Sequence, residues 1–267
     1  MKIKGEDKTF NFRQNKETGQ MIVTAVGEKH LDIIVTKLKT RYNVDVVLSN
    51  PKVPYRETIR KKVIQEATHK KQSGGSGQYG KVVIEFEPGT QDELEFGERV
   101  VGGSVPKQFF PSVEKGLQES VKSGVLAGYP VVKLKATLVD GKYHPVDSKE
   151  VAFVSAASMA YRTGLPNAAP VLLEPIQSVK IIVPDKYMGD VIGDLNKRRG
   201  RVLGMTPVEY GKQEIEAEVP FAEMFTYATD LRSIAHARAK FTSEFVRYED
   251  VPSHIAQAII EAAKAEE

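Results

Sequence analysis

Four glycines fall within the seven residues 74–80, and the segments on either side decide how this stretch folds. The glycines match the G-x-G-x-x-G pattern of dinucleotide sites, in which a buried strand precedes the glycines and a helix follows them. Here residues 62–71 are polar and charged, whereas residues 81–87 are β-branched and aromatic, as in a strand. We therefore predict the tip of a β-hairpin and no dinucleotide site.

The same loop carries side chains that suit a nucleic acid. Ammonium groups bind phosphates, amides bond to base edges, and tyrosine rings stack on bases. These groups are present as Lys70, Lys71, Gln72, Gln78 and Tyr79. The loop is therefore predicted to contact RNA or DNA.

The composition restricts the class of protein. The 267 residues, 41% hydrophobic and 27% charged, are enough for one large soluble domain or several small ones. The absence of cysteine excludes disulfides and thiolate metal sites, and the five histidines lack the spacing of a zinc site. Because we find no membrane-spanning run and no signal-peptide core, we expect a cytoplasmic location and no membrane partner.

The net charge of +3 does not by itself indicate nucleic-acid binding, but the basic residues are clustered. Clusters occur at 60–62, 69–71 and 197–201, while acidic residues gather at 92–95. A nearly neutral protein with local basic patches still binds phosphate backbones locally. Solvated surface charge is the alternative explanation for each cluster.

The first fifty residues predict two strands, a helix and a further strand. Residues 10–13 and 21–26 are strand-like, and apolar residues recur at helical spacing over 28–41. Residues 44–48 form the last expected strand, before a boundary that contains two prolines. Such a unit leaves one side of its sheet uncovered, and we interpret it as part of a truncated domain.

The second segment contains the glycine loop, two expected helices and another irregular loop. The helices are predicted over 106–122 and 148–161, the second with Ser148 as its N-cap. Between them, residues 131–139 are strand-like, and 140–148 contain the Asp-Gly and His-Pro pairs of a loop.

The third segment alternates strands and helices in the order βαββαβ of a ferredoxin-like domain. Its strands are expected at 179–183, 202–206, 214–219 and 240–248, and its helices at 184–200 and from 223. A terminal helix is predicted over 253–265, with Ser253 as its cap.

The second loop contains the side chains of a catalytic triad, His144, Asp147 and Ser148, but triad members usually come from distant positions in the chain. Turn formation and helix capping are the favoured interpretation, with His144 as a polar side chain able to stack on RNA or donate to it. We find no Gly-Lys pair followed by Ser or Thr, so a Walker A loop is absent from the sequence.

Several motifs together resemble the C-terminal half of bacterial elongation factor G. They are the glycine loop and the segments 126–131, 143–148, 170–175, 189–200 and 223–233. Residues 1–50 resemble the later part of that factor's domain III, residues 51–173 its domain IV, and residues 174–252 its domain V, with a C-terminal helix at 253–267. The resemblance implies an α+β multidomain fold, in which ferredoxin-like α/β sandwiches flank a ribosomal protein S5 domain 2-like domain.

The resemblance also implies a function. The intact factor is a GTPase that moves tRNA and mRNA through the ribosome, with a tRNA-mimicking domain IV whose tip enters the decoding centre. Domain V lies against large-subunit RNA. Because the GTPase domain is missing from the resemblance, we expect no enzymatic activity and no cofactor in this chain, with GTP and magnesium in the parent protein. The expected partners are the ribosome and the tRNA–mRNA duplex, bound by a monomer.

The resemblance assigns RNA contacts to two tip loops and to one basic cluster. The tip residues are Gln72, Gly74, Gly75, Ser76, Gly77, Gln78, Tyr79, Tyr143, His144 and Asp147. The cluster consists of Lys197, Arg198 and Arg199, for which opposition to a helix dipole is an equally good explanation. Catalytic and metal-binding residues are not predicted.

Two residues depart from the family's pattern. Ser76 stands where the family usually has arginine, and Pro145 stands where aspartate usually follows the histidine. Both features resemble elongation factor G-like paralogues, so a ribosome recycling or ribosomal protection factor is the alternative within translation. Outside translation, the alternatives are a generic RNA-binding module and an RNA-modifying or hydrolytic enzyme with a pocket at His144.

Overall fold

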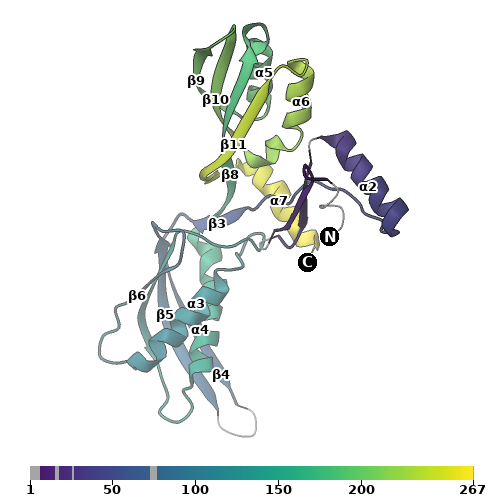
Figure 1. Cartoon of the computed structure of the whole chain (residues 1–267). Coiled ribbons are helices and arrows are strands. Elements are labelled where there is room, and N and C mark those ends of the chain that lie inside the picture. Colours follow the sequence, from purple (N-terminus) through teal and green to yellow (C-terminus); the bar gives the residue numbers. More distant parts are fainter. Residues whose placement is uncertain (1–6, 16–17, 26, 73–76, 267) are drawn as a thin grey trace. The chain divides into compact units, whose positions relative to one another are not determined.

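The computed structural model (Figure 1) describes residues 7–15, 18–25, 27–72 and 77–266. The contacts divide the chain into two compact units, each built from two segments far apart in the sequence. The first unit comprises Met1–Pro54 and Pro175–Arg247, and the second comprises Tyr55–Glu174 and Tyr248–Glu267. Within the described residues, no helix is long and apolar enough to cross a membrane.

The first unit begins with a two-stranded sheet and one helix. Strand β1 (Asn11–Gln14) pairs antiparallel with β2 (Met21–Thr24), and helix α2 (Glu28–Tyr42) follows. Phe10 and Ile34 are buried between the sheet and the helix. These elements confirm the first part of the predicted pattern.

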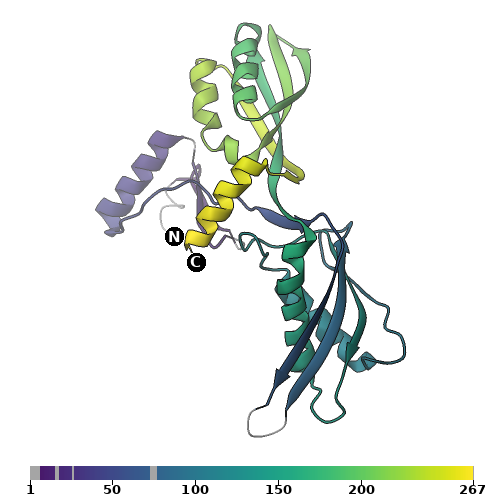
Figure 2. The same cartoon turned by 180° about the vertical axis from the view of Figure 1, so that it is seen from behind.

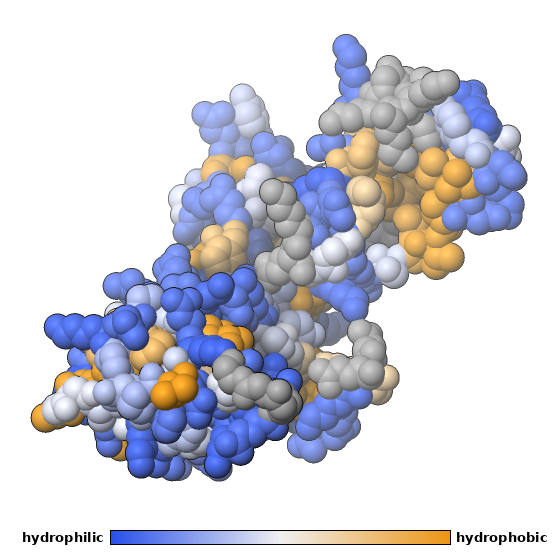
Figure 3. All heavy atoms as spheres, turned by 90° about the horizontal axis from the view of Figure 1, so that it is seen from below, coloured by the Kyte–Doolittle hydropathy of each residue, from blue (hydrophilic) through white to orange (hydrophobic). Residues whose placement is uncertain are grey.

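The strand predicted at residues 44–48 is wrong, because these residues adopt no strand. A strand needs a neighbouring edge whose N–H and C=O groups pair with its own, and among the described residues β1 and β2 form a sheet of two strands. Val46, Val47 and Leu48 instead line an apolar hollow of about 210 Å³ with residues of β1, β2 and α2. Hydrophobic atoms are exposed in this part of the chain (Figure 3), and Val47 is 94% exposed.

The remainder of the first unit confirms the ferredoxin-like pattern. Its elements are β8 (Pro170–Pro184, which starts in the second unit), α5 (Met188–Lys197), β9 (Arg201–Val208), β10 (Lys212–Pro220), α6 (Tyr227–Ile234) and β11 (Lys240–Asp250). The strands lie in the order β11-β8-β10-β9. Alternate residues of β8 and β10, such as Val179, Ile181 and Ile215, are buried with Val191 and Leu195 of α5.

Short 3₁₀ turns precede α5 and α6. Residues Asp185–Tyr187 lead into α5, and Phe221–Met224 lead toward α6. The helix expected from Glu223 therefore begins at Tyr227. Proline immediately before each turn fixes an extended backbone at the end of the preceding strand.

The second unit contains a four-stranded sheet in the order β4-β5-β7-β6. Its elements are β4 (Val63–Lys71), β5 (Gln78–Pro88), β6 (Glu95–Glu98), a 3₁₀ turn (Lys107–Phe109), α3 (Phe110–Ser120), β7 (Leu134–Lys142), α4 (Glu150–Gly164) and a second 3₁₀ turn (Leu165–Ala168). Figures 1 and 2 show α3 and α4 on one side of this sheet. Phe86, Leu138 and Phe153 belong to the core between the two layers.

Two glycines allow close packing in the second unit. A Cβ atom on Gly116 would lie 2.5 Å from the carbonyl oxygen of Val154, so α3 and α4 touch through their backbones. A Cβ atom on Gly80 would lie 3.1 Å from the carbonyl oxygen of Ala152, so β5 meets the first turn of α4 there. This second contact fixes β5 close to the end of the sheet that carries the glycine loop.

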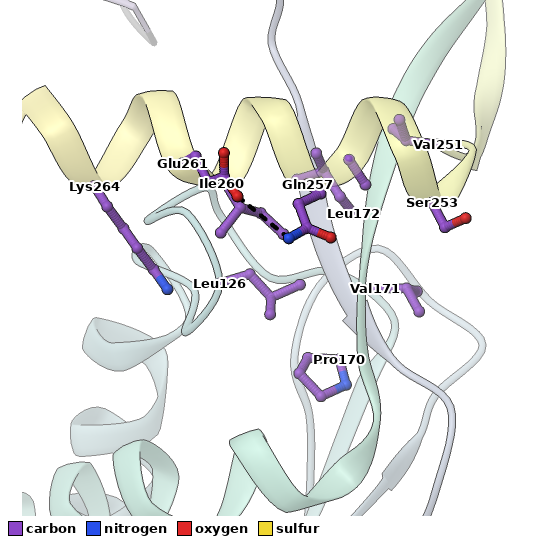
Figure 4. Close-up of a pocket in the computed structure, with 11 residues that line it drawn as sticks. Leu126, Pro170, Val171, Leu172, Val251, Ser253, Gln257, Ile260, Glu261 and Lys264 are labelled. Atoms are coloured by element: carbon purple, nitrogen blue, oxygen red, sulfur yellow. Dashed lines mark hydrogen bonds between the residues drawn. The ribbon is translucent and has the colours of Figure 1, made fainter.

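The second unit is completed by β3 (Arg56–Ile59), which pairs with the start of β8, and by the terminal helix α7 (Ser253–Glu266). The predicted cap is off by one residue, because the carbonyl of Pro252 accepts the N–H groups of Ile255 and Ala256. A hollow of about 410 Å³ lies between α7 and a wall formed by Leu126 and residues 170–172. Figure 4 shows the residues that line it.

Candidate nucleic-acid interface

Both predicted loops lie at the same end of the sheet in the second unit (Figures 1 and 2). Strands β4 and β5 form an antiparallel hairpin in which Lys71 pairs with Gln78, which confirms the predicted hairpin. The second loop follows β7, whose last residue, Lys142, pairs with Lys81 of β5. We call the described residues 70–72, 77–79 and 142–148 the tip.

The tip surrounds a hollow of about 290 Å³. Its lining residues are Lys70, Lys71, Gln72, Gly77, Gln78, Tyr79, Lys142, Tyr143, His144 and Asp147. The structure thus brings together every predicted tip residue that it describes, whereas Gly74, Gly75 and Ser76 lie outside the described residues. Lys142 was missed as a site residue, although its position directly before Tyr143 was a usable signal.

Ser148 joins the two loops. Its hydroxyl donates to the carbonyl oxygen of Tyr79 and accepts the N–H of His144, both at 2.8 Å. Two backbone bonds add to this connection: the N–H of Tyr79 donates to the carbonyl of Asp147, and that of Ser148 to the carbonyl of His144, both at 3.0 Å.

The N-cap role predicted for Ser148 is therefore wrong. Helix α4 begins at Glu150, and its N-cap residue, Lys149, makes no side-chain cap bond. The Ser148 hydroxyl instead donates to the carbonyl oxygen of Tyr79, which is 69 residues away in the chain.

The residues of the considered triad lie in one turn but do not form a nucleophile–base pair. The Nδ1 atom of His144 accepts the backbone N–H groups of Val146 and Asp147, at 3.3 and 3.2 Å. The Ser148 hydroxyl donates to a backbone carbonyl and not to the imidazole. A serine nucleophile needs a base that accepts its proton, which this geometry does not provide.

The glycine-loop side of the tip is similarly ordered. The Oε1 atom of Gln78 lies 3.0 Å from Nε2 of His69, which fixes the amide across the hairpin. A Cβ atom on Gly77 would lie 3.0 Å from Oδ1 of Asp147, so a larger residue at position 77 would displace that carboxylate.

Three lysines outside the tip are paired with carboxylates of the second unit. Lys62 lies 2.8 Å from Glu85, Lys81 lies 2.7 Å from Glu66, and Lys135 lies 2.9 Å from Glu87. The hydrogen bond to Glu66 raises the pKa of Lys81, and the bond to Glu87 likewise raises the pKa of Lys135.

The tip lysines differ from these. Lys70, Lys71 and Lys142 are exposed, and none of them forms an ion pair with a described residue. Uncompensated ammonium groups around a polar hollow are suited to bind the phosphates of a nucleic acid.

The basic cluster of the first unit has a different environment. The Arg198 guanidinium, only 12% exposed, donates to Asp194 at 2.7 Å, to the Glu223 carbonyl at 2.6 Å and to Asp230. Arg199 donates to the Glu223 carboxylate at 3.1 Å, while Lys197 is exposed. These bonds favour a structural role for the two arginines and leave Lys197 accessible.

Among the described residues, no group of three His, Asp or Glu side chains is placed so that it could hold a metal ion.

Comparison with known proteins identifies the class of the chain. Family models match in three places: elongation factor G domain III at residues 1–50, domain IV at 51–169 and the C-terminus at 171–259. Together with the α+β fold, these matches define the chain as part of a translation elongation factor. More particularly, it belongs to the elongation factor G family. The three matched models do not include a GTPase domain.

A solved structure matches the whole length of this chain. The sequence of a protein from Thermus thermophilus is 42% identical to this chain, and its crystal structure superposes with a TM-score of 0.89. The match covers 100% of this chain and 40% of that protein. The chain therefore spans less than half the length of this relative.

Proposed function

We propose that the tip binds RNA in the decoding centre of the small ribosomal subunit, as part of a GTPase that promotes translocation of tRNA and mRNA. The observation that carries the proposal is the convergence of the tip residues on one hollow beside three lysines that form no ion pair with a described residue. The lysines bind phosphates, the exposed Tyr143 stacks on a base, and Gln78 and His144 bond to polar RNA atoms.

The remaining parts of the chain have supporting roles in this proposal. Residues 1–50, 51–173 and 174–252 act as domains III, IV and V, and residues 253–267 as a terminal helix. Lys197 contacts large-subunit RNA, whereas Arg198 holds domain V together. The chain acts as a monomer in the cytoplasm. The GTPase domain of the parent protein binds GTP and magnesium and carries out the catalytic step.

Ribosome recycling or ribosomal protection is the second candidate, favoured by Ser76 and Pro145. Pro145 lies in the turn of residues 145–147, a kind of segment in which proline is common. A translocation assay with the GTPase-containing parent protein distinguishes the two functions. Movement of mRNA by one codon per GTP supports translocation, and splitting of ribosomes without movement supports recycling.

The binding proposal is tested with the 267-residue chain. We expect it to bind small subunits carrying mRNA and tRNA more tightly than an unrelated structured RNA, and we expect Gln78→Ala and His144→Ala to weaken that binding. The control is Lys122→Ala, at an exposed lysine two residues beyond the end of α3, which leaves binding unchanged. Equal affinity for both RNAs would instead support a generic RNA-binding module.

A further inference from the structure

The imidazole of His144 is oriented by the backbone of its own turn. Two N–H donors, from Val146 and Asp147, face Nδ1 at 3.3 and 3.2 Å. One acceptor, the carboxylate of Asp147, lies 3.4 Å from the same nitrogen. A nitrogen that accepts from two amides cannot carry a proton, so in the neutral ring the proton resides on Nε2.

Ser148 determines whether this turn keeps its shape. Its hydroxyl accepts the N–H of His144 and donates to Tyr79, so one side chain joins both loops. An alanine at position 148 would leave the His144 N–H and the Tyr79 carbonyl without this partner. The position of the imidazole relative to the glycine-loop side of the hollow would then be free to vary.

We propose that Ser148 is a positioning residue that holds His144 as its Nε2–H tautomer, so that the tip offers one fixed N–H donor to RNA. The identity of the ligand rests on the proposed function. Nδ1 and Nε2 lie on opposite flanks of the ring, and Nε2 makes no bond to a described residue. His144 is 53% exposed and lines the hollow. The matching RNA atom is therefore an acceptor, a phosphate or 2′-hydroxyl oxygen beside the tip lysines.

The tautomer is tested without any ribosome. Nitrogen-15 spectra of the chain labelled at histidine, assigned with His144→Ala, report at neutral pH which ring nitrogen of His144 carries the proton. The expected result is protonated Nε2 and unprotonated Nδ1 in the wild type and in Ser148→Thr, and a mixture of tautomers in Ser148→Ala. A wild-type ring protonated mainly on Nδ1 would overturn the proposal, as would an unchanged spectrum in Ser148→Ala.

The positioning role is tested by a double-mutant cycle, in which the affinity of each variant for small subunits carrying mRNA and tRNA is measured. Ser148→Ala is expected to weaken binding about fivefold to tenfold, the range of one lost hydrogen bond, while Ser148→Thr restores it. In the His144→Ala background, Ser148→Ala should add little further loss, because the two residues act through one donor. Independent, multiplicative losses would contradict the proposal.

Ser120 provides the control for this cycle. Ser120→Ala removes a half-buried serine hydroxyl that bonds to Gly116 and Ser158, away from the tip, and should leave ribosome binding unchanged. Thermal unfolding of each variant shows whether weaker binding comes from misfolding or from loss of the His144 N–H donor. If wild-type chain binds no better to small subunits than to unrelated RNA, the proposed function fails, whereas the spectra still decide the role of Ser148.

Discussion

At the scale of single residues, the hydroxyl of Tyr227 is buried without a hydrogen-bond partner among the described residues. Its ring packs against Phe241, with 5.0 Å between centroids, and burial raises the pKa of the hydroxyl. We expect Tyr227→Phe to leave the free energy of unfolding unchanged or to raise it by about 1 kcal/mol, because an unsatisfied polar group is removed. Urea unfolding measures this difference.

Tyr161 is the matched control for that experiment. It is also buried, but its hydroxyl donates to the carbonyl of Ser123 at 3.1 Å. Tyr161→Phe should therefore lower the free energy of unfolding by about 1 kcal/mol. Equal losses in the two variants would show that the Tyr227 hydroxyl has a partner.

The environment of Glu57 also predicts a measurable change in the free energy of unfolding. Its carboxylate is 1% exposed and accepts the N–H groups of Leu126, Ala127 and Tyr129 at 2.8, 2.9 and 3.2 Å. In Glu57→Gln, the amide NH₂ group would face a backbone donor. We expect a loss of about 1–3 kcal/mol in the free energy of unfolding, measured with urea.

Glu66→Gln is the control for Glu57, since Glu66 is an exposed carboxylate paired with Lys81. Exposed pairs of this kind contribute about 0–1 kcal/mol. A Glu57→Gln variant no less stable than Glu66→Gln would show that the three backbone bonds contribute little.

At the scale of elements, the contact of α3 with α4 depends on Gly116. Alanine normally stabilises a helix by about 1 kcal/mol relative to glycine. Here its Cβ would lie 2.5 Å from the Val154 carbonyl oxygen, so the helices must separate. We expect Gly116→Ala to lower the melting temperature, because overpacking costs about 1–3 kcal/mol or more.

For a substitution of Gly193 in α5, we expect the opposite change in melting temperature. A Cβ atom added there would have no neighbour within 4 Å. Gly193→Ala should therefore raise the melting temperature by virtue of helix propensity alone. If both substitutions shift the melting temperature in the same direction, helix packing does not decide the outcome at position 116.

A carboxylate in the sheet of the ferredoxin-like domain predicts that the stability of the chain depends on pH. Bonds from Arg247, at 2.6 Å, and Arg201, at 2.5 Å, lower the pKa of Glu218 from 4.5 to about 2. A lowered pKa means that the carboxylate contributes stability above pH 4.5 and loses it as the pH falls toward 2. Glu218→Gln should be less stable at neutral pH and lose less stability over that interval, as measured by urea unfolding at several pH values.

At the scale of the whole molecule, the tip lysines set the salt dependence of RNA binding. Each phosphate contact adds about one to the slope of log affinity against log salt concentration. Replacing Lys70, Lys71 or Lys142 by alanine should lower that slope by about one each, measured with small subunits. Lys122→Ala should leave the slope unchanged, and tip variants that weaken binding without changing it would contradict the assignment of phosphate contacts.

Local patterns predicted most elements of this chain, since strand alternation and helical spacing are properties of neighbouring residues. Which described residues gather at the tip was implied by the resemblance to elongation factor G, because local patterns alone do not bring the two loops together. Local patterns failed where a distant partner decides the structure. Among the described residues, 44–48 have no strand edge to pair with, and Ser148 bonds to Tyr79 instead of capping a helix.

The distribution of lysine partners along β5 has a kinetic consequence. Lysines that form no ion pair with a described residue lie at the Gln78 end of the strand, and Asp92, Glu93 and Glu95 follow its Pro88 end. The tip therefore carries local positive charge even though the net charge of the chain is only +3. Local charge of this kind attracts a polyanion before contact and raises the rate of association. Added salt should then slow the encounter itself as well as loosen the complex.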